Sequence, residues 1–174
     1  CVITGSRADY GLLRRVIGGI QSDPDLTLQL VVTGTHLSKD YGSTYEEIKQ
    51  DGFEISGEIH TVGDSDSPAA NAESMGRGLT GFGRILEKLK PDLLVVLGDR
   101  FEILAATAAA LVARIPVAHI HGGEVTEGAY DDAIRHSITK MSNLHFVATE
   151  KCRKRVIQLG EDPNSVFLVG GLGV

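Results

Sequence analysis

The chain has 174 residues, of which 42% are hydrophobic and 23% are charged, a balance typical of a soluble globular domain. Its formal net charge is −6 and its pI is near 5.5, which argues against a general nucleic-acid-binding surface or an anionic-membrane surface. No apolar run in the sequence approaches the roughly 20 residues needed to span a bilayer.

The cysteine pattern and the two ends suggest a cytoplasmic domain of a longer protein. Cys1 and Cys152 are far apart, and no cysteine–histidine cluster has metal-ligand spacing, so we expect neither a disulfide framework nor a metal site. The chain opens in an expected strand, and we therefore expect no signal peptide. Residues 166–174 leave a last strand through glycines. We therefore expect residues 1–174 to form an N-terminal domain followed by another.

The first predicted strand leads into a turn that suits an anion. Val2–Thr4 forms this strand, and a helix is expected over about 9–21 from apolar residues at helical spacing. The Gly/Ser turn between them directs backbone N–H groups at a helix N-terminus, and Arg7 adds a cation. The dinucleotide G-x-G-x-x-G fingerprint and the Walker A lysine are both missing. A tight turn with a surface arginine is the alternative.

The next segment is predicted to hold two strands and two helices. Strands are expected over 26–33 and 53–60, the second near a sheet edge, and helices over 43–51 and 69–90. His36, at the end of the earlier strand, either contacts a ligand or is a solvated loop residue. The long helix has an expected apolar stripe and four glycines that permit either close packing or a kink. The stripe comprises Met75, Leu79, Phe82, Ile85, Leu86 and Leu89, and the glycines are Gly76, Gly78, Gly81 and Gly83.

The central stretch, residues 91–136, repeats a pattern of strand, charged turn and helix. Residues 92–97 and 117–121 are expected strands, and helices are expected to begin near Phe101 and Asp131. In open α/β sheets the ligand crevice lies at the carboxyl ends of the strands. The candidate residues at or after those ends are Asp99, Arg100, His121, Glu124, Asp131, Asp132 and Arg135.

A further strand over 144–148, a helix over 150–159 and a last strand over 166–169 complete the pattern. The basic residues of that helix are most simply a solvated face; they are Lys151, Arg153, Lys154 and Arg155. Six or seven short strands alternating with helices predict an α/β fold with a Rossmann-like, doubly wound parallel sheet.

Each charged residue of the central stretch could have either a structural role or a functional role. Asp99 either caps the following helix or takes part in chemistry. His121 and Glu124 flank a glycine pair and suit general acid–base work, although a plain glycine turn with polar neighbours is possible. Asp131 and Asp132 either form i,i+4 pairs with Arg135 and His136 or share a proton as a carboxylate pair. Arg7 and Arg100 suit a phosphate or pyrophosphate.

At these residues the sequence resembles the hydrolysing UDP-N-acetylglucosamine 2-epimerases. The motifs are GSRADYG (5–11), GDRFE (98–102), HIHGGE (119–124) and DDAIRHSITK (131–140). They occur in the family's order over nearly the whole chain. The resemblance implies the N-terminal half of a glycosyltransferase-B-like fold, in which two Rossmann-like domains enclose the active site and the second, UDP-binding domain lies beyond residue 174.

The resemblance also implies a reaction and a set of site residues. UDP-N-acetylglucosamine and water become N-acetylmannosamine and UDP, through removal of the C2 proton, loss of UDP and addition of water to a glycal. Asp99, Glu124 and Asp131 match the acid–base positions. Arg7, Ala8 and Arg100 match nucleotide or substrate contacts, and Asp132 is a further candidate substrate contact. Many members carry a glutamate at the position of His121, so either His121 or Glu124 is the general base.

The expected function is thus a UDP-sugar 2-epimerase of sialic-acid or capsule biosynthesis, with no cofactor, as a cytoplasmic homo-oligomer (dimer or tetramer). One competitor changes only the substrate, to UDP-2,4-diacetamido-2,4,6-trideoxyglucose on a legionaminic-acid route. Another is a UDP-sugar-binding domain without catalysis, which predicts nucleotide binding and no exchange of the C2 proton.

Overall fold

The fold is built on one sheet of seven parallel strands. The computed structural model describes residues 1–38, 44–63, 65, 67–126 and 130–173. The strands lie in the order β3-β2-β1-β4-β5-β6-β7, and every neighbouring pair is parallel. They are β1 (Val2–Thr4), β2 (Leu30–Thr33), β3 (Ile55–Ile59), β4 (Leu94–Leu97), β5 (Val117–Ile120), β6 (Leu144–Val147) and β7 (Val166–Leu168). The predicted Rossmann-like parallel sheet is confirmed, with β3 at an edge.

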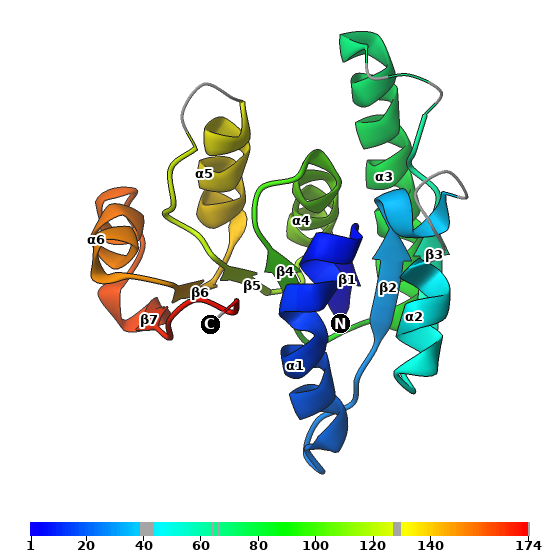
Figure 1. Cartoon of the computed structure of the whole chain (residues 1–174). Coiled ribbons are helices and arrows are strands. Elements are labelled where there is room, and N and C mark those ends of the chain that lie inside the picture. The colour runs from blue at the N-terminus through cyan, green and yellow to red at the C-terminus, as the bar shows by residue number, and fades with distance from the viewer. Residues whose placement is uncertain (39–43, 64, 66, 127–129, 174) are drawn as a thin grey trace.

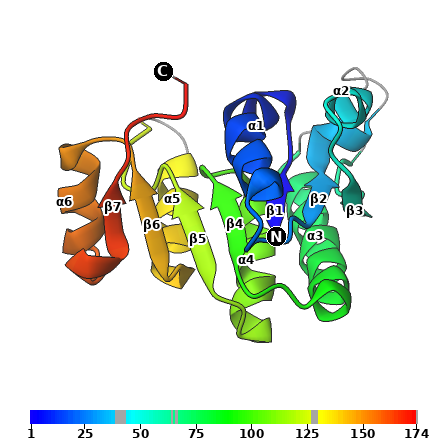
Figure 2. The same ribbon diagram turned by 90° about the horizontal axis from the view of Figure 1, so that it is seen from below.

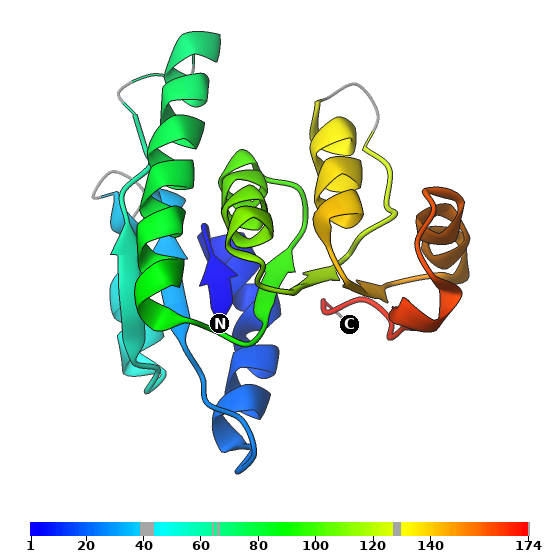
Figure 3. The same ribbon diagram turned by 180° about the vertical axis from the view of Figure 1, so that it is seen from behind.

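Helices cover both faces of this sheet. They are α1 (Arg7–Ser22), α2 (Thr44–Gln50), α3 (Pro68–Leu89), α4 (Phe101–Ala113), α5 (Asp131–Met141) and α6 (Glu150–Gln158), with 3-10 turns η1 (Gly34–Leu37) and η3 (Pro163–Ser165). Figures 1 and 3 show α3, α4 and α5 on the face opposite to α1. Figure 2 shows the strands side by side, with α1 over the middle of the sheet.

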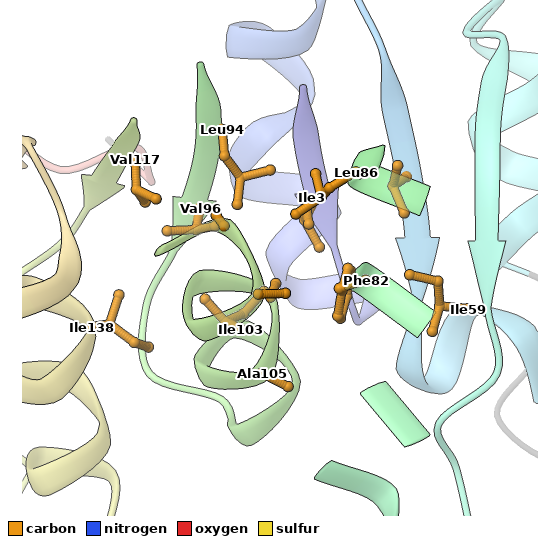
Figure 4. Packing of buried hydrophobic residues seen from close by; sticks show 14 residues of the cluster. Ile3, Ile59, Phe82, Leu86, Leu94, Val96, Ile103, Ala105, Val117 and Ile138 are labelled. Carbon is orange, nitrogen blue, oxygen red and sulfur yellow. The ribbon is translucent and has the colours of Figure 1, made fainter. Parts of the chain in front are cut away.

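Each face has its own apolar core. On one face, Ile3 and Val96 of the central strands pack against α3, α4 and α5 (Figure 4). On the other, Val2 and Val32 pack against α1 and α2. Because successive residues of a strand point to opposite faces, a strand covered on both sides is apolar throughout. This explains the continuous apolar runs that predicted the strands.

The glycines of α3 serve close packing. A Cβ atom at Gly81 would lie 2.6 Å from Cγ2 of Ile59, and one at Gly78 would lie 3.3 Å from Cβ of Ala105. At Gly76 and Gly83 a Cβ would meet no described atom within 4 Å. The helix therefore approaches β3 and α4 through two of its four glycines, and α3 runs unbroken across all of them.

Several predicted elements differ in detail from the structure. The predicted stripe of α3 was wrong at Leu79, which is 46% exposed, because the buried positions are Ser74, Gly78, Phe82 and Leu86. The strand predicted over 26–33 begins only at Leu30, since Leu26 is exposed in a turn. The strand predicted over 117–121 ends at Ile120, because the next residue turns into a left-handed conformation. Of the helix predicted over 43–51, residue 43 lies outside the described residues.

Candidate functional site

The order in which the chain adds strands reverses between β1 and β4. Helices α1 and α4 begin just after these two strands. The chain proceeds from β1 to β2 on one side, whereas from β4 it proceeds to β5 on the other. Ser6 caps α1 by accepting a hydrogen bond from the backbone N–H of Asp9 at 3.3 Å. Arg7 and Ala8 are exposed in the first turn of α1. A switch point with a helix N-terminus is the position at which such folds bind an anionic ligand.

A partly buried cluster of charged residues, Asp9, Arg100 and Glu102, lies beside this turn. Nη2 of Arg100 donates to Oε1 of Glu102 at 3.1 Å, and the Glu102 side chain is 2% exposed. Burial raises the pKa of the Asp9 carboxyl, while Ser6 and Arg100 lower it. Oδ2 of Asp9, Nε of Arg100 and Oε2 of Glu102 are buried without a hydrogen-bond partner among the described residues. Sequence reasoning found Arg100 and missed both carboxylates, since an acidic residue in a first helical turn is ordinarily exposed.

Arg100 and Glu102 also line a cavity of about 740 Å³. Much of its wall is polar and comes from the loops after β2 and β3 and from the first turns of α3. The polar lining includes Thr35, Ser38, His60, Thr61, Ser65, Asn71 and Ser74. Arg100 therefore lines a cavity whose polar wall suits a hydrophilic ligand.

Asp99 is paired with Arg135 of α5 and does not cap α4. The cap residue is Arg100, which makes no side-chain capping bond. The buried guanidinium of Arg135 donates to Oδ2 of Asp99 and, at 3.0 Å, to Oγ1 of Thr126. The capping reading of Asp99 and the expected pair of Arg135 with Asp131 were therefore wrong. The Arg135 side chain is 7% exposed and that of Asp99 is 22% exposed, so their attraction is less screened by water than that of an exposed pair on one helix.

Several carboxylates are gathered around Asp99. Burial raises its pKa, the Arg135 guanidinium lowers it, and the charges of Asp131 and Glu124 raise it. These last two residues are thus close enough to Asp99 to act on its charge, as expected from their places at strand ends. Nearby like charges push one carboxyl toward the protonated form, which produces an acid and a base in one site.

His121 lies in the left-handed region, with φ of 63°, directly after β5. Its backbone N–H donates to the Phe146 carbonyl at 2.9 Å. On the side chain, Nδ1 lies 3.7 Å from Oε1 of Glu124, and Nε2 accepts a hydrogen bond from the backbone N–H of Leu172 at 3.2 Å. The structure therefore brings together the two residues between which the general base was left open.

Of the glycine pair after His121, Gly123 is packed against α6. Gly123 has φ of 78°, and a Cβ there would lie 2.5 Å from the carbonyl oxygen of Cys152. The guanidinium of Arg155 donates to the Gly123 carbonyl. The prediction of a solvated basic face on α6 was wrong at Arg155, because this side chain binds the turn that carries His121 and Glu124.

Two buried histidines, His36 and His119, contact the strand and the turn next to the site. His119 is fully buried, with Nε2 2.8 Å from the Gly98 carbonyl and Nδ1 3.2 Å from Oγ1 of Thr139. Burial lowers the pKa of His119 to about 4, so the ring is neutral at pH 7 and donates through Nε2 to the turn that carries Asp99. His36 lies 2.9 Å from Oγ1 of Thr4 and is 1% exposed, so the expectation of a solvated loop histidine was wrong. Burial lowers its pKa to about 4, and the charge of Arg100 acts in the same direction.

Asp132 is the last of the candidate site residues. Asp132 forms the expected i,i+4 pair with His136, at 3.4 Å. Residues 127–129, which belong to the loop leading to Asp131, lie outside the described residues. Within the part of the chain that the structure describes, no group of three or more His, Cys, Asp or Glu residues could hold a metal ion. No helix in that part has the length and apolarity to cross a membrane.

Comparison with known proteins gives a consistent result. A family model described as "UDP-N-acetylglucosamine 2-epimerase" matches residues 19–174. The chain is 45% identical over 172 residues to the "GDP/UDP-N,N'-diacetylbacillosamine 2-epimerase (hydrolyzing)" of Campylobacter jejuni, covering 99% of this chain and 44% of the relative. It is 46% identical over 171 residues to the "Polysialic acid biosynthesis protein P7" of Escherichia coli, covering 98% of this chain and 44% of the relative.

A solved structure shares the fold. The UDP-N-acetylglucosamine 2-epimerase of Neisseria meningitidis, crystallised with UDP-N-acetylglucosamine, superposes with a TM-score of 0.86 at 22% identity. The match covers 98% of this chain and 46% of that one. The chain thus spans less than half the length of the proteins it matches.

Proposed function

The chain belongs to the UDP-N-acetylglucosamine 2-epimerase family, and on this premise we propose that it is the first of two domains of a hydrolysing UDP-sugar 2-epimerase. The proposed substrate is UDP-N-acetylglucosamine, and the products are N-acetylmannosamine and UDP. The name of the Campylobacter relative supports the hydrolysing course. Cytoplasmic location, a homo-oligomer and a UDP-binding second domain stay predictions.

The observation that carries the proposal is the group of carboxylates around the partly buried Asp99–Arg135 pair. Asp99 and Glu124 lie in the turns after two strands, Asp131 begins a helix, and the charges of Asp131 and Glu124 raise the pKa of Asp99. Removing a proton from carbon and returning one to the opposite face requires a base and an acid in one site. A carboxyl with a raised pKa beside further carboxylates is a chemical arrangement suited to that requirement.

The reaction follows in two steps. A carboxylate takes the C2 proton, the C2–H electrons form a C1=C2 double bond, and the C1–O bond breaks so that UDP leaves with its electron pair. Water then adds its oxygen to C1 as a carboxylate of the site takes one of its protons, and the C1=C2 electron pair takes a proton at C2 from an acid on the other face. The free sugar released has the inverted C2 configuration.

The leaving diphosphate needs positive charge and hydrogen-bond donors. The turn after β1 offers both, because Arg7 is exposed at the N-terminus of α1 and the first-turn N–H groups point to the same edge. Arg100 is the second cation on this edge, and Glu102 holds its guanidinium. We assign Arg7, Ala8 and Arg100 to the contacts of the UDP-sugar.

The proposal is tested with the full-length protein and UDP-N-acetylglucosamine in D₂O, followed by proton NMR. We expect release of UDP with N-acetylmannosamine that carries deuterium at C2. Asp99→Asn, Glu124→Gln and Asp131→Asn are each expected to lower turnover by about 10²–10⁴-fold, the usual effect of losing an acid–base group. Lys154→Gln, an exposed change on α6, is the control. UDP binding without deuterium exchange, for every substrate tried, would show a binding domain instead.

A second candidate changes only the sugar. At 45% identity, the Campylobacter relative is named for N,N'-diacetylbacillosamine, which is 2,4-diacetamido-2,4,6-trideoxyglucose. This sugar differs from N-acetylglucosamine at C4 and C6, away from the reacting carbons. Parallel assays of both nucleotide sugars decide between them: the substrate is the one with the higher kcat/KM.

A further inference from the structure

The two ring nitrogens of His121 face different neighbours. Nε2 lies 3.2 Å from the backbone nitrogen of Leu172 and Nδ1 lies 3.7 Å from Oε1 of Glu124. A backbone N–H can only donate, so the nitrogen that accepts from it carries no proton. In a neutral imidazole the proton is then on the other nitrogen. The ring of His121 thus presents an N–H group to Glu124.

We propose that the backbone N–H of Leu172 fixes this tautomer of His121, and that His121 is a positioning residue for Glu124, which takes the proton from C2. This inference rests on the proposed function and assigns the general base within it. In the arrangement seen, neither nitrogen of His121 has a free lone pair for the substrate. The carboxylate of Glu124, whose side chain is 39% exposed, does.

The segment that carries Leu172 is held in place. After β7, the N–H of Val169 donates to the Val147 carbonyl at 3.0 Å. The side chain of Leu172 then packs on the apolar core beneath α1, and a Cβ at Gly173 would lie 3.4 Å from Cδ2 of Leu12. The donor to His121 therefore belongs to a segment that folds back over the sheet, and it is part of the packed domain.

The contact between His121 and Glu124 is loose in this state. Their 3.7 Å separation is about 0.5 Å beyond ordinary hydrogen-bonding range, and such contacts often tighten when substrate binds. The His121 N–H would then orient one carboxylate oxygen and leave the other for the C2 proton. When that proton moves to Glu124, the C1–O bond to UDP breaks and the glycal forms.

The tautomer itself is the first test. Full-length protein carrying ¹⁵N-labelled histidine is examined by NMR at neutral pH, with His121→Asn identifying the His121 signals. We expect Nδ1 to be protonated and Nε2 to be unprotonated. Protonation of Nε2 instead would overturn the inference. Because this measurement does not require turnover, the inference about His121 can fail while the proposed function holds, and the reverse.

Substitution of His121 gives a second test. Asparagine tolerates the left-handed backbone at this position and its amide can place an N–H near that of Nδ1, whereas glutamine reaches toward the Nε2 position. We expect His121→Asn to keep C2 deuterium exchange within about tenfold of wild type, while Glu124→Gln loses about 10²–10⁴-fold. His121→Gln should be slower than His121→Asn. Equal loss in His121→Asn and Glu124→Gln would make His121 the base.

The role of Leu172 is tested by removing its N–H. Leu172→Pro deletes the donor, and Leu172→Met measures the cost of changing the side chain alone. We expect Leu172→Pro to lower kcat more than Leu172→Met does, with KM little changed. In a His121→Asn background this extra loss should disappear, because the two residues act through one contact. The same extra loss in both backgrounds would show a merely structural role and overturn the inference.

Discussion

At the residue scale, the most informative side chain is Arg135. Its spacing from Asp131 suggested a surface pair on one helix, but its guanidinium is buried and reaches Asp99, 36 residues away in the sequence. The i,i+4 rule describes exposed helix faces and fails where a buried charge offers a stronger partner. No pattern in a single sequence reveals such a pairing.

Arg135→Met should shift the ionisation of Asp99. The guanidinium lowers the pKa of this carboxyl, so its removal raises that pKa further. The limb of the pH profile of kcat/KM that reports Asp99 should therefore move to higher pH in full-length protein. Arg153→Met removes an arginine of α6 that pairs with Glu150 and serves as the charge-matched control. An unmoved profile would mean that Asp99 is not among the groups that limit the rate.

The buried histidines should make the fold sensitive to acid. The pKa values of His36 and His119 lie near 4, below the ordinary 6.5, so the unfolded chain takes up their protons first. Their contribution to stability is complete above about pH 6.5 and is lost as the pH falls toward about 4. Urea unfolding at pH 7 and pH 5 measures this loss.

The raised pKa of Asp9 has the opposite effect on stability, because it favours the folded protein as the pH falls. The contribution of the histidines is therefore measured by comparing variants. His119→Asn should flatten the loss of stability between pH 7 and pH 5. His60→Gln, at an exposed histidine whose side chain is 72% accessible, should leave it as in wild type. A loss equally steep in all three proteins would contradict the assignment to buried histidines.

At the element scale, periodicity predicted the helices well and their buried faces less well. The strand and helix alternation of residues 91–136 is confirmed, since apolar runs and charged turns are local signals. The face of α3 was mistaken because its buried stripe contains Ser74 and Gly78, which carry no hydrophobic signal. Similarly, the burial of Glu102 depends on the neighbouring β2 turn and Arg100, which only the fold brings together.

Alanine substitutions in α3 should separate its packed glycines from its free ones. At Gly83 a Cβ meets no described atom within 4 Å, so Gly83→Ala should stabilise the protein by about 0.5–1 kcal/mol through helix propensity. At Gly81 the Cβ would collide with Ile59, so Gly81→Ala should destabilise by about 1–3 kcal/mol. Urea denaturation measures both. Equal effects at the two sites would mean that α3 does not pack on β3 as described.

At the scale of the whole molecule, both faces of the sheet carry a complete core within residues 1–174. We therefore expect this segment to unfold cooperatively when expressed alone. We also expect it to lack turnover, because the proposed second domain supplies half of the cleft. A urea transition followed by two spectroscopic probes, together with the UDP-release assay, checks both statements. Turnover at the full-length rate would refute the two-domain proposal.

The strand order also bears on how the domain is made on the ribosome. β1 is synthesised before its two neighbours β2 and β4, yet it lies inside the sheet and pairs with both of them. While only β1 to β3 have emerged, the edge of β1 is an unpaired template for any other strand. The arrival of β4 closes that edge, and the remaining strands then add outward one at a time. The domain is therefore most vulnerable to misassembly during translation of the long α3, before β4 leaves the exit tunnel.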